Sequence, residues 1–206
     1  AMKYLRDNAE EYNVTTGQVG VIGFSAGGHL AATVSTQTTG ADKPAFQILF
    51  YPVITMDASY THSGSRSCLI GSSAAPSLTN KYSNEKQVKA DNPMAYICWA
   101  DDDDIVPPRN SIEYVNALKA KGVPVHAKNF PTGGHGYGFK PSYKYHNEMI
   151  EDLTEWMNSI DSILTSIDTP ADDEIKDEAC YDLNGRPVKK AKRGIFIKKG
   201  RKYLVK

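Results

Sequence analysis

Three groups of residues in this 206-residue chain have the chemistry of a nucleophilic hydrolase. Ser25 lies in Gly23-Phe24-Ser25-Ala26-Gly27, His135 lies in a glycine-rich loop over 131–138, and four consecutive aspartates occupy 101–104. A serine hydroxyl is protonated at neutral pH, so its attack on a carbonyl needs a base, and the base needs an orienting carboxylate. The residues therefore predict Ser25 as nucleophile, His135 as base and one of the aspartates as the acid.

The pentapeptide around Ser25 has the pattern of a tight strand-to-helix turn, the nucleophile elbow. An apolar run over 19–24 predicts a buried strand before it, and 29–38 predicts a helix after it. We expect glycines on both sides of Ser25 because their neighbours approach too closely for side chains. The turn would place the N–H of Ala26 where it can bind an oxyanion. The alternative is a glycine-rich turn with an idle serine.

The aspartate run leaves the acid ambiguous. Four adjacent like charges repel one another, so most of them must face water. We predict that Asp102 meets His135, with Asp103 as the second choice. For His135 the alternative is an ordinary surface loop.

The other histidines and the cysteines suggest no metal centre. His29 falls in the elbow helix and is predicted to be structural, while His62 could line a substrate pocket. The chain has three cysteines, an odd and small number that does not indicate a disulfide framework. No spacing of Cys and His residues suggests a zinc site. We expect neither a metal nor a cofactor.

Apolar runs alternate with amphipathic segments along most of the chain. Strands are predicted over 19–24, 45–51, 93–100 and 123–130, and helices over 2–13, 29–38, 111–121 and 142–166. The segment 55–92 is irregular, with one short helix expected near 78–81, and could cover the mouth of a site. The pattern predicts an α/β fold with a mostly parallel sheet, in which all three groups follow the carboxyl ends of strands.

The zero net charge hides a division within the chain. Residues 180–206 carry ten basic residues and one acidic residue, a balance of +9, so the remainder, with fourteen basic and twenty-three acidic, carries −9. We therefore predict a catalytic region over 1–167, an acidic linker over 168–179 and a basic β-hairpin-like tail over 180–206. Asn184-Gly185 and Lys199-Gly200 are the expected hairpin turns. The tail is short and poor in aromatic residues, so we predict no nucleic-acid partner.

Membrane insertion is not expected, because no run of eighteen apolar residues occurs. The first residues lack an apolar signal region. An export signal would then have been removed, or would lie upstream of this chain.

Four segments together resemble a known family: GFSAGGHLA, FYPVITMD, HSGSR and the stretch from DDDDIVPPRN to PTGGHGYGF. They resemble the C-terminal half of α/β-hydrolase esterases, above all acetyl esterases and acetylxylan esterases, which are related to dienelactone hydrolases and prolyl oligopeptidases. The resemblance covers about residues 2–165. It implies Ser25, His135 and Asp102 as the triad, Ala26 as an oxyanion donor, and acetyl esters of xylan or other sugars as substrates.

The chain departs from that family before the elbow. Family members carry further strands there and a loop that supplies a second oxyanion N–H. We therefore expect a partial hydrolase fold with one unpaired sheet edge. Association with a second copy or with a missing N-terminal half would cover it.

The basic tail resembles a short β-rich C-terminal segment of many secreted Bacteroidetes proteins. That resemblance implies a secreted or periplasmic protein of a gut or rumen bacterium. Two other functions stay open: a prolyl-oligopeptidase-like peptidase, and a weakly active or inactive hydrolase fragment that acts as a partner or binding module.

Overall fold

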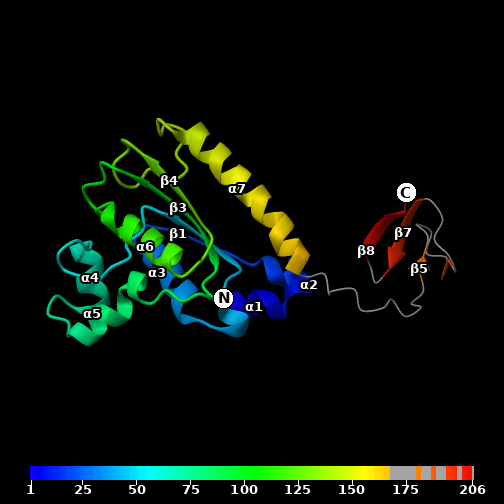
Figure 1. Ribbon diagram of the computed structural model, residues 1–206, viewed down its shortest axis with the longest axis horizontal. Helices are drawn as coiled ribbons and strands as arrows, with labels where there is room; N and C mark the ends of the chain where they lie inside the picture. Colours follow the sequence, from blue (N-terminus) through cyan, green and yellow to red (C-terminus); the bar gives the residue numbers. More distant parts are fainter. Residues whose placement is uncertain (168–179, 182–186, 189–193, 199–200, 206) are drawn as a thin grey trace. The chain divides into compact units, whose positions relative to one another are not determined.

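The structure, a computed structural model, describes residues 1–167, 180–181, 187–188, 194–198 and 201–205 (Figure 1). The chain divides into two compact units, Ala1–Asp168 and Thr169–Lys206, which are described separately. The predicted linker, 168–179, lies outside the described residues.

The first unit is built on a four-stranded parallel sheet. Its strands are β1 (Val21–Phe24), β2 (Phe46–Phe50), β3 (Met94–Ala100) and β4 (Val125–Phe130), in the order β1-β2-β3-β4. All three pairings are parallel. The prediction of a mostly parallel sheet is confirmed, and each predicted strand is found within a few residues of its expected ends.

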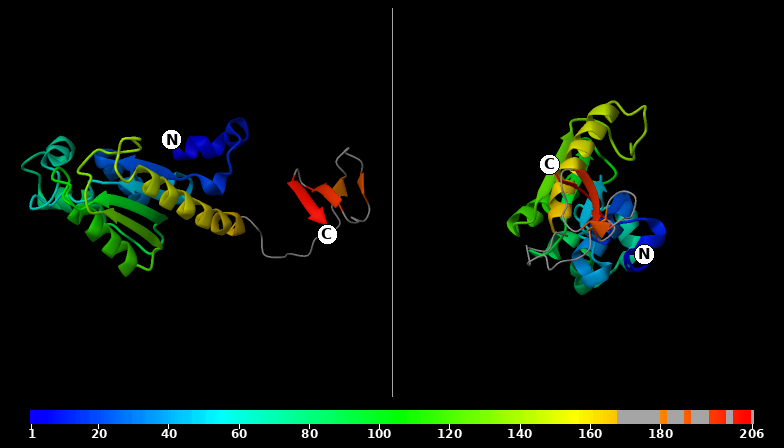
Figure 2. Two further views of the ribbon diagram at one scale, coloured as in Figure 1. Left: turned by 90° about the horizontal axis from the view of Figure 1, so that it is seen from above. Right: turned by 90° about the vertical axis from the view of Figure 1, so that its right-hand side faces the viewer.

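Seven α-helices accompany the sheet in the described residues. They are α1 (Met2–Asp7), α2 (Ala9–Tyr12), α3 (Ser25–Gln37), α4 (Ser63–Ile70), α5 (Pro76–Tyr82), α6 (Arg109–Ala120) and α7 (His146–Ile167). Figure 1 shows α3 and α6 on one face of the sheet and α7 on the other, and the left view of Figure 2 shows α7 running lengthwise along it.

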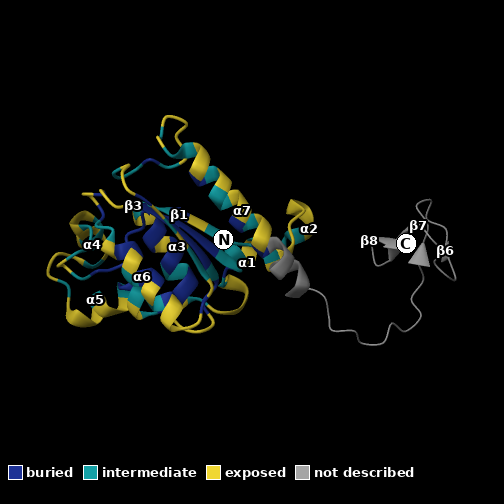
Figure 3. Cartoon of the chain, turned by 45° about the horizontal axis from the view of Figure 1, so that its top comes forward, coloured by how far each residue is buried: buried dark blue, intermediate teal, exposed yellow. Residues whose placement is uncertain are grey.

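Alternation along the central strands gives each face of the sheet its own core, because successive side chains of a strand point to opposite faces. In β2, Leu49 packs towards α3 and α6, while Ile48 and Phe50 pack towards α7. The central strands β2 and β3 are buried, whereas the outward faces of the helices are exposed (Figure 3). Both faces are thus covered, as parallel sheets require.

The sheet has an open edge at β1. Within the described residues β1 pairs with β2 alone, and Ile22 on β1 is 48% exposed. This observation agrees with the expected unpaired edge.

Two predicted segments differ from the structure. The helix expected over 2–13 is interrupted at Asn8, whose side-chain amide donates to the Tyr4 carbonyl. The segment 55–92 holds two helices rather than one, α4 and α5. These helices start at a histidine cap, His62, and at a proline in the first turn, Pro76.

The second unit contains a small antiparallel sheet with the order β6-β5-β7-β8. Its strands are β5 (Cys180–Tyr181), β6 (Pro187–Val188), β7 (Gly194–Lys198) and β8 (Arg201–Val205). Lys198 pairs with Arg201 across β7 and β8. Both predicted turns, Asn184-Gly185 and Lys199-Gly200, lie outside the described residues.

No helix in the described part of the chain is both long and apolar enough to cross a membrane. Across the same residues, no cluster of three or more His, Cys, Asp or Glu side chains could hold a metal ion.

Candidate active site

Ser25, His135 and Asp103 form a continuous chain of hydrogen bonds. The Oγ of Ser25 lies 2.8 Å from Nε2 of His135, and Nδ1 of His135 lies 2.7 Å from Oδ2 of Asp103. The three residues follow β1, β4 and β3, and therefore meet at the carboxyl edge of the parallel sheet. In this arrangement the imidazole can take the serine proton while the carboxylate stabilises the resulting imidazolium.

The backbone at Ser25 is strained in the way that the elbow pattern predicts. Its φ is +52°, in the left-handed region that residues with a side chain rarely adopt. A Cβ on Gly23 would lie 2.3 Å from the Gly27 carbonyl oxygen, and one on Gly28 would lie 2.7 Å from Cβ of Pro52. Gly27 itself has open space around it. The tight glycine after the serine is therefore Gly28, and our expectation for Gly27 was wrong.

Ser25 begins α3, so Ala26 occupies the first turn of a thirteen-residue helix. The first four N–H groups of a helix have no partner within it, and the positive end of the helix dipole lies there. The Ala26 N–H is accordingly available to an oxyanion formed at Ser25.

The acid beside His135 is Asp103, which corrects the choice of Asp102. Oδ1 of Asp103 accepts hydrogen bonds from the N–H groups of Ile105 and Val106, while its Oδ2 faces the histidine. These bonds turn the Asp103 side chain inward, where it is 5% exposed.

Asp102 is exposed, and its Oδ1 accepts a hydrogen bond from the Gly134 N–H at 2.7 Å. That bond lowers the pKa of the Asp102 carboxyl. Asp102 thus fastens the loop that carries His135 without touching the imidazole.

The other two aspartates of the run, Asp101 and Asp104, are not part of this series of hydrogen bonds. Asp101 accepts hydrogen bonds from the Trp99 indole and from the Asn129 amide, and Asp104 is exposed.

The loop carrying His135 depends on its glycines. Gly133, Gly134, Gly136 and Gly138 all have positive φ, and Gly133 packs so closely on Tyr143 that a Cβ would lie 2.7 Å from its ring. Only glycine enters these backbone regions without strain. The loop thus returns the chain sharply enough to aim His135 at Ser25.

The comparison with family models matches residues 1–160 to the prolyl oligopeptidase family. The chain belongs to this family. Its sheet and flanking helices are also those of an α/β hydrolase from a deep-sea metagenome, with a TM-score of 0.62 at 25% identity over 80% of this chain and 62% of that one. The fold expected from the sequence, an α/β-hydrolase sheet with flanking helices, is therefore confirmed.

Curated relatives of this family member include enzymes of xylan breakdown. The chain is 38% identical over 162 residues to an acetylxylan esterase of Xylanibacter ruminicola, covering 77% of this chain and 34% of that protein. It is 33% identical over 147 residues to endo-1,4-beta-xylanase B of Butyrivibrio fibrisolvens, covering 66% of this chain and 23% of that protein. The chain thus spans about a third of the acetylxylan esterase and less of the xylanase.

Solved structures give the same picture. An acetyl ester-xyloside bifunctional hydrolase from Caldicellulosiruptor lactoaceticus superposes with a TM-score of 0.73 at 32% identity, covering 78% of this chain and 63% of that one. A sugar hydrolase from Lactococcus lactis superposes with a TM-score of 0.67 at 27% identity, covering 79% of this chain and 66% of that one.

Tyr51 also belongs to this site, and it was not among the residues predicted from the sequence. Tyr51 follows β2 with a φ of +36°, and its ring packs against the imidazole of His135. Its N–H donates to the Cys98 carbonyl, and the N–H of Val53, two residues on, donates to the Ser25 carbonyl at 3.0 Å. A Tyr-Pro pair directly after a buried strand was the available signal.

His62, which could line a substrate pocket according to the sequence, caps the N-terminus of α4. Its Nδ1 accepts a hydrogen bond from the Ser65 N–H and lies 2.9 Å from the Ser65 Oγ. His62 does not line the cavity described next. Its contact with substrate stays a prediction.

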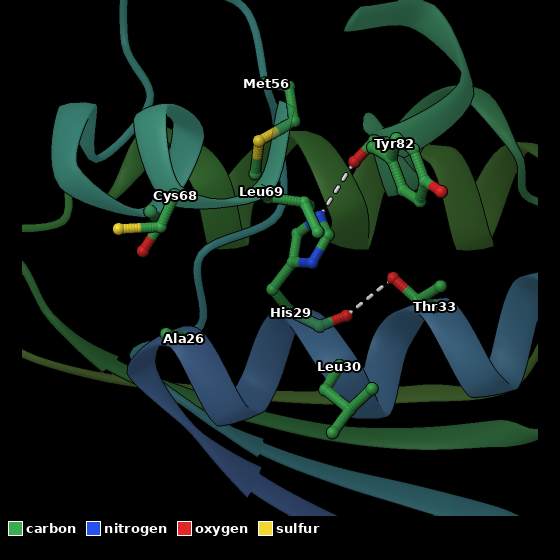
Figure 4. A pocket seen from close by; sticks show the side chains of 9 residues that line it. Ala26, His29, Leu30, Thr33, Met56, Cys68, Leu69 and Tyr82 are labelled. Atoms are coloured by element: carbon green, nitrogen blue, oxygen red, sulfur yellow. Dashed lines mark hydrogen bonds between the residues drawn. The ribbon is translucent and has the colours of Figure 1, made fainter. Parts of the chain in front are cut away.

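A cavity of about 380 Å³ runs beside α3, starting at Ala26 (Figure 4). Figure 4 shows α3 along one side and α4 across from it, with His29 rising between them towards Tyr82. His29 is buried, and its Nε2 lies 2.8 Å from the Tyr82 carbonyl oxygen, so its predicted structural role agrees with its position.

Proposed function

We propose that this protein is a serine carboxylesterase that hydrolyses acetyl esters, with xylan fragments or other acetylated sugars as substrates. The observation that carries the proposal is the unbroken series of hydrogen bonds from Ser25 through His135 to Asp103. The relatives named as an acetylxylan esterase and an acetyl ester-xyloside hydrolase support the choice of acyl group and alcohol.

The proposed reaction has two halves. Ser25 Oγ attacks the ester carbonyl carbon while its proton passes to Nε2 of His135, and the carbonyl oxygen becomes an oxyanion held by the Ala26 N–H. The intermediate then collapses, the proton moves from His135 to the leaving alkoxide, and an acetyl-serine remains. Water deprotonated by His135 attacks that ester, which releases acetate and restores Ser25.

A second oxyanion donor and a partner for β1 belong to the same proposal. Loss of one oxyanion donor costs on the order of a hundred- to a thousand-fold in rate, so a single N–H leaves an esterase slow. The exposed edge at β1 and the short span relative to the curated relatives support pairing with another segment, from a second copy or from an N-terminal half. A native mass measurement of the purified protein distinguishes monomer from assembly.

A fluorophosphonate probe tests the proposed nucleophile directly. We expect labelling at Ser25, no labelling of Ser25→Ala, and hydrolysis of p-nitrophenyl acetate by the wild type alone. Turnover by Ser25→Ala equal to that of an active wild type would overturn the role of Ser25. Absence of both labelling and turnover in the wild type would favour the inactive binding module.

The peptidase alternative has support from the family match. Release of acetate from acetylated xylan, with no cleavage of a prolyl-p-nitroanilide substrate, separates the esterase from it. The reverse result would favour the peptidase.

A further inference from the structure

The loop that carries His135 needs support from outside itself. Four of the eight residues over 131–138 are glycines, and all four have positive φ. Glycine gives the backbone this freedom at an entropic cost, so contacts with other residues have to fix the shape of the loop. The hydrogen bond from the Gly134 N–H to Asp102 is one such contact.

A row of tyrosine rings lies against this loop. The Tyr137 ring, two residues after His135, is 4% exposed and stands edge-on to Tyr51, with ring centroids 4.6 Å apart. Tyr143 stacks on Tyr137 at 4.2 Å, with the planes inclined by only 8°. Because Tyr51 packs against the imidazole, continuous ring contacts connect Tyr143 to His135.

Tyr143 also packs against the backbone of the loop. A Cβ on Gly133 would lie 2.7 Å from the Tyr143 ring and 2.8 Å from its hydroxyl oxygen, so ring and backbone are in close contact. Phe130, at the end of β4, meets the Tyr143 ring edge-on, with centroids 5.9 Å apart. Tyr143 therefore contacts the loop before His135, at Gly133, and after it, at Tyr137.

The ring of Tyr143, and not its hydroxyl, makes these contacts. The hydroxyl oxygen is buried and has no hydrogen-bond partner among the residues that the structure describes. Burial raises the pKa of Tyr143, so the phenol stays neutral at neutral pH. The contribution of this residue to the site therefore comes from the shape of its ring, which phenylalanine shares.

We propose that Tyr143 is a positioning residue for the base. Its ring holds the loop before and after His135 and so keeps the imidazole within reach of Ser25 and Asp103. The imidazole has to meet both partners at once, Ser25 at 2.8 Å and Asp103 at 2.7 Å. A displacement of about 1 Å can cost about a hundredfold in rate. The proposal rests on the hydrolase function proposed above and adds a residue to its machinery.

Kinetics per active site test this role. We compare hydrolysis of p-nitrophenyl acetate by the wild type, Tyr143→Leu, Tyr143→Phe and Trp156→Leu, with active sites counted from the endpoint of fluorophosphonate labelling. Trp156 is the matched control, because it belongs to the same core but packs its ring on Phe46 and Tyr96. Tyr143→Leu should lower kcat at least about tenfold with KM within about twofold. Tyr143→Phe should retain most of kcat, and Trp156→Leu should match the wild type per active site.

A proton NMR spectrum tests the alignment without turnover. The proton between Nδ1 of His135 and Asp103 lies in a short hydrogen bond and should resonate far downfield, and its disappearance in His135→Gln assigns it. The signal should persist in Tyr143→Phe and Trp156→Leu and should be broadened or lost in Tyr143→Leu. If Tyr143→Leu does not fold, Tyr143→Met takes its place in both measurements, since a flexible thioether fills the space without a flat ring.

The outcomes separate the two proposals. The positioning role is overturned by a kcat per site in Tyr143→Leu equal to the wild type, or by an intact downfield signal in that variant. A loss in Tyr143→Phe or Trp156→Leu as large as that in Tyr143→Leu overturns it too. In all these cases, wild-type turnover and labelling of Ser25 leave the esterase standing. If the wild type shows neither, the esterase fails, and the downfield signal of the variants still decides whether Tyr143 aligns His135.

Discussion

The ring of Tyr51 stands edge-on against the imidazole of His135, with ring centroids 4.8 Å apart and planes inclined by 64°. The same segment reaches the nucleophile, since the Val53 N–H donates to the Ser25 carbonyl and Pro52 lies under Gly28. Residues 51–53 therefore contact both the elbow and the base. Strained backbone that surrounding contacts hold in place is typical of functional sites, and the φ of Tyr51 fits this pattern.

Tyr51→Ala should lower kcat for p-nitrophenyl acetate by about ten- to a hundredfold while KM changes little, because the imidazole loses the surface that aligns it. Tyr51→Phe keeps the ring and should retain most of kcat. Steady-state kinetics and the rate of fluorophosphonate labelling measure both effects. Equal losses of kcat in the two variants would show that the hydroxyl, rather than the packing of the ring, matters.

Variants of the two neighbouring aspartates, Asp102 and Asp103, test which carboxylate orients His135. Asp103→Asn should lower kcat by up to about 10⁴-fold, since an amide cannot stabilise the imidazolium. Asp102→Asn keeps an oxygen that can accept the Gly134 N–H, so its loss should stay within about tenfold. Kinetics of both variants at one pH give the comparison. A larger loss in Asp102→Asn than in Asp103→Asn would contradict the geometry.

The choice between Asp102 and Asp103 could not be predicted from the sequence, whereas the fold around them could. The sheet and the serine turn could be predicted because apolar runs and the Gly-x-Ser-x-Gly spacing are local signals. The choice among four aspartates depends on a turn in which Asp103 accepts from two N–H groups ahead of it, a geometry that identical side chains do not reveal. A displacement by one residue was enough to select the wrong carboxylate.

The contact between Tyr51 and His135 could not be predicted from the sequence either. Tyr51 and His135 are far apart in sequence, and their contact exists only because β2, β3 and β4 are adjacent in the sheet. The cap formed by His62 was missed for a different reason, since histidine is not among the preferred cap residues.

The glycines of the elbow predict opposite effects on stability. A methyl group on Gly23 would lie 2.3 Å from a backbone oxygen that cannot move aside, so Gly23→Ala should destabilise the fold by about 1–3 kcal/mol. Gly27→Ala has open space in a helix, where alanine is favoured by about 0.5–1 kcal/mol. Urea unfolding of the two variants measures the difference. The expectation fails if Gly27→Ala is the less stable of the two.

The buried imidazole of His29 predicts a loss of stability in mild acid. Burial lowers its folded pKa below the ordinary 6.5, so between these two values the unfolded chain binds a proton that the folded chain does not. The unfolded state is therefore favoured as pH falls below about 6.5, with a slope of at most about 1.4 kcal/mol per pH unit from this residue. Above pH 7 the two states carry the same charge at His29 and the contribution disappears.

A neutral replacement isolates this contribution. In His29→Gln the side chain does not titrate and can still donate to the Tyr82 carbonyl, so its free energy of unfolding should fall less steeply between pH 7 and pH 5 than that of the wild type. Urea titrations at several pH values give both slopes. Parallel curves would mean that His29 becomes protonated in the folded protein, which would require the contact with Tyr82 or the burial of the ring to change in acid.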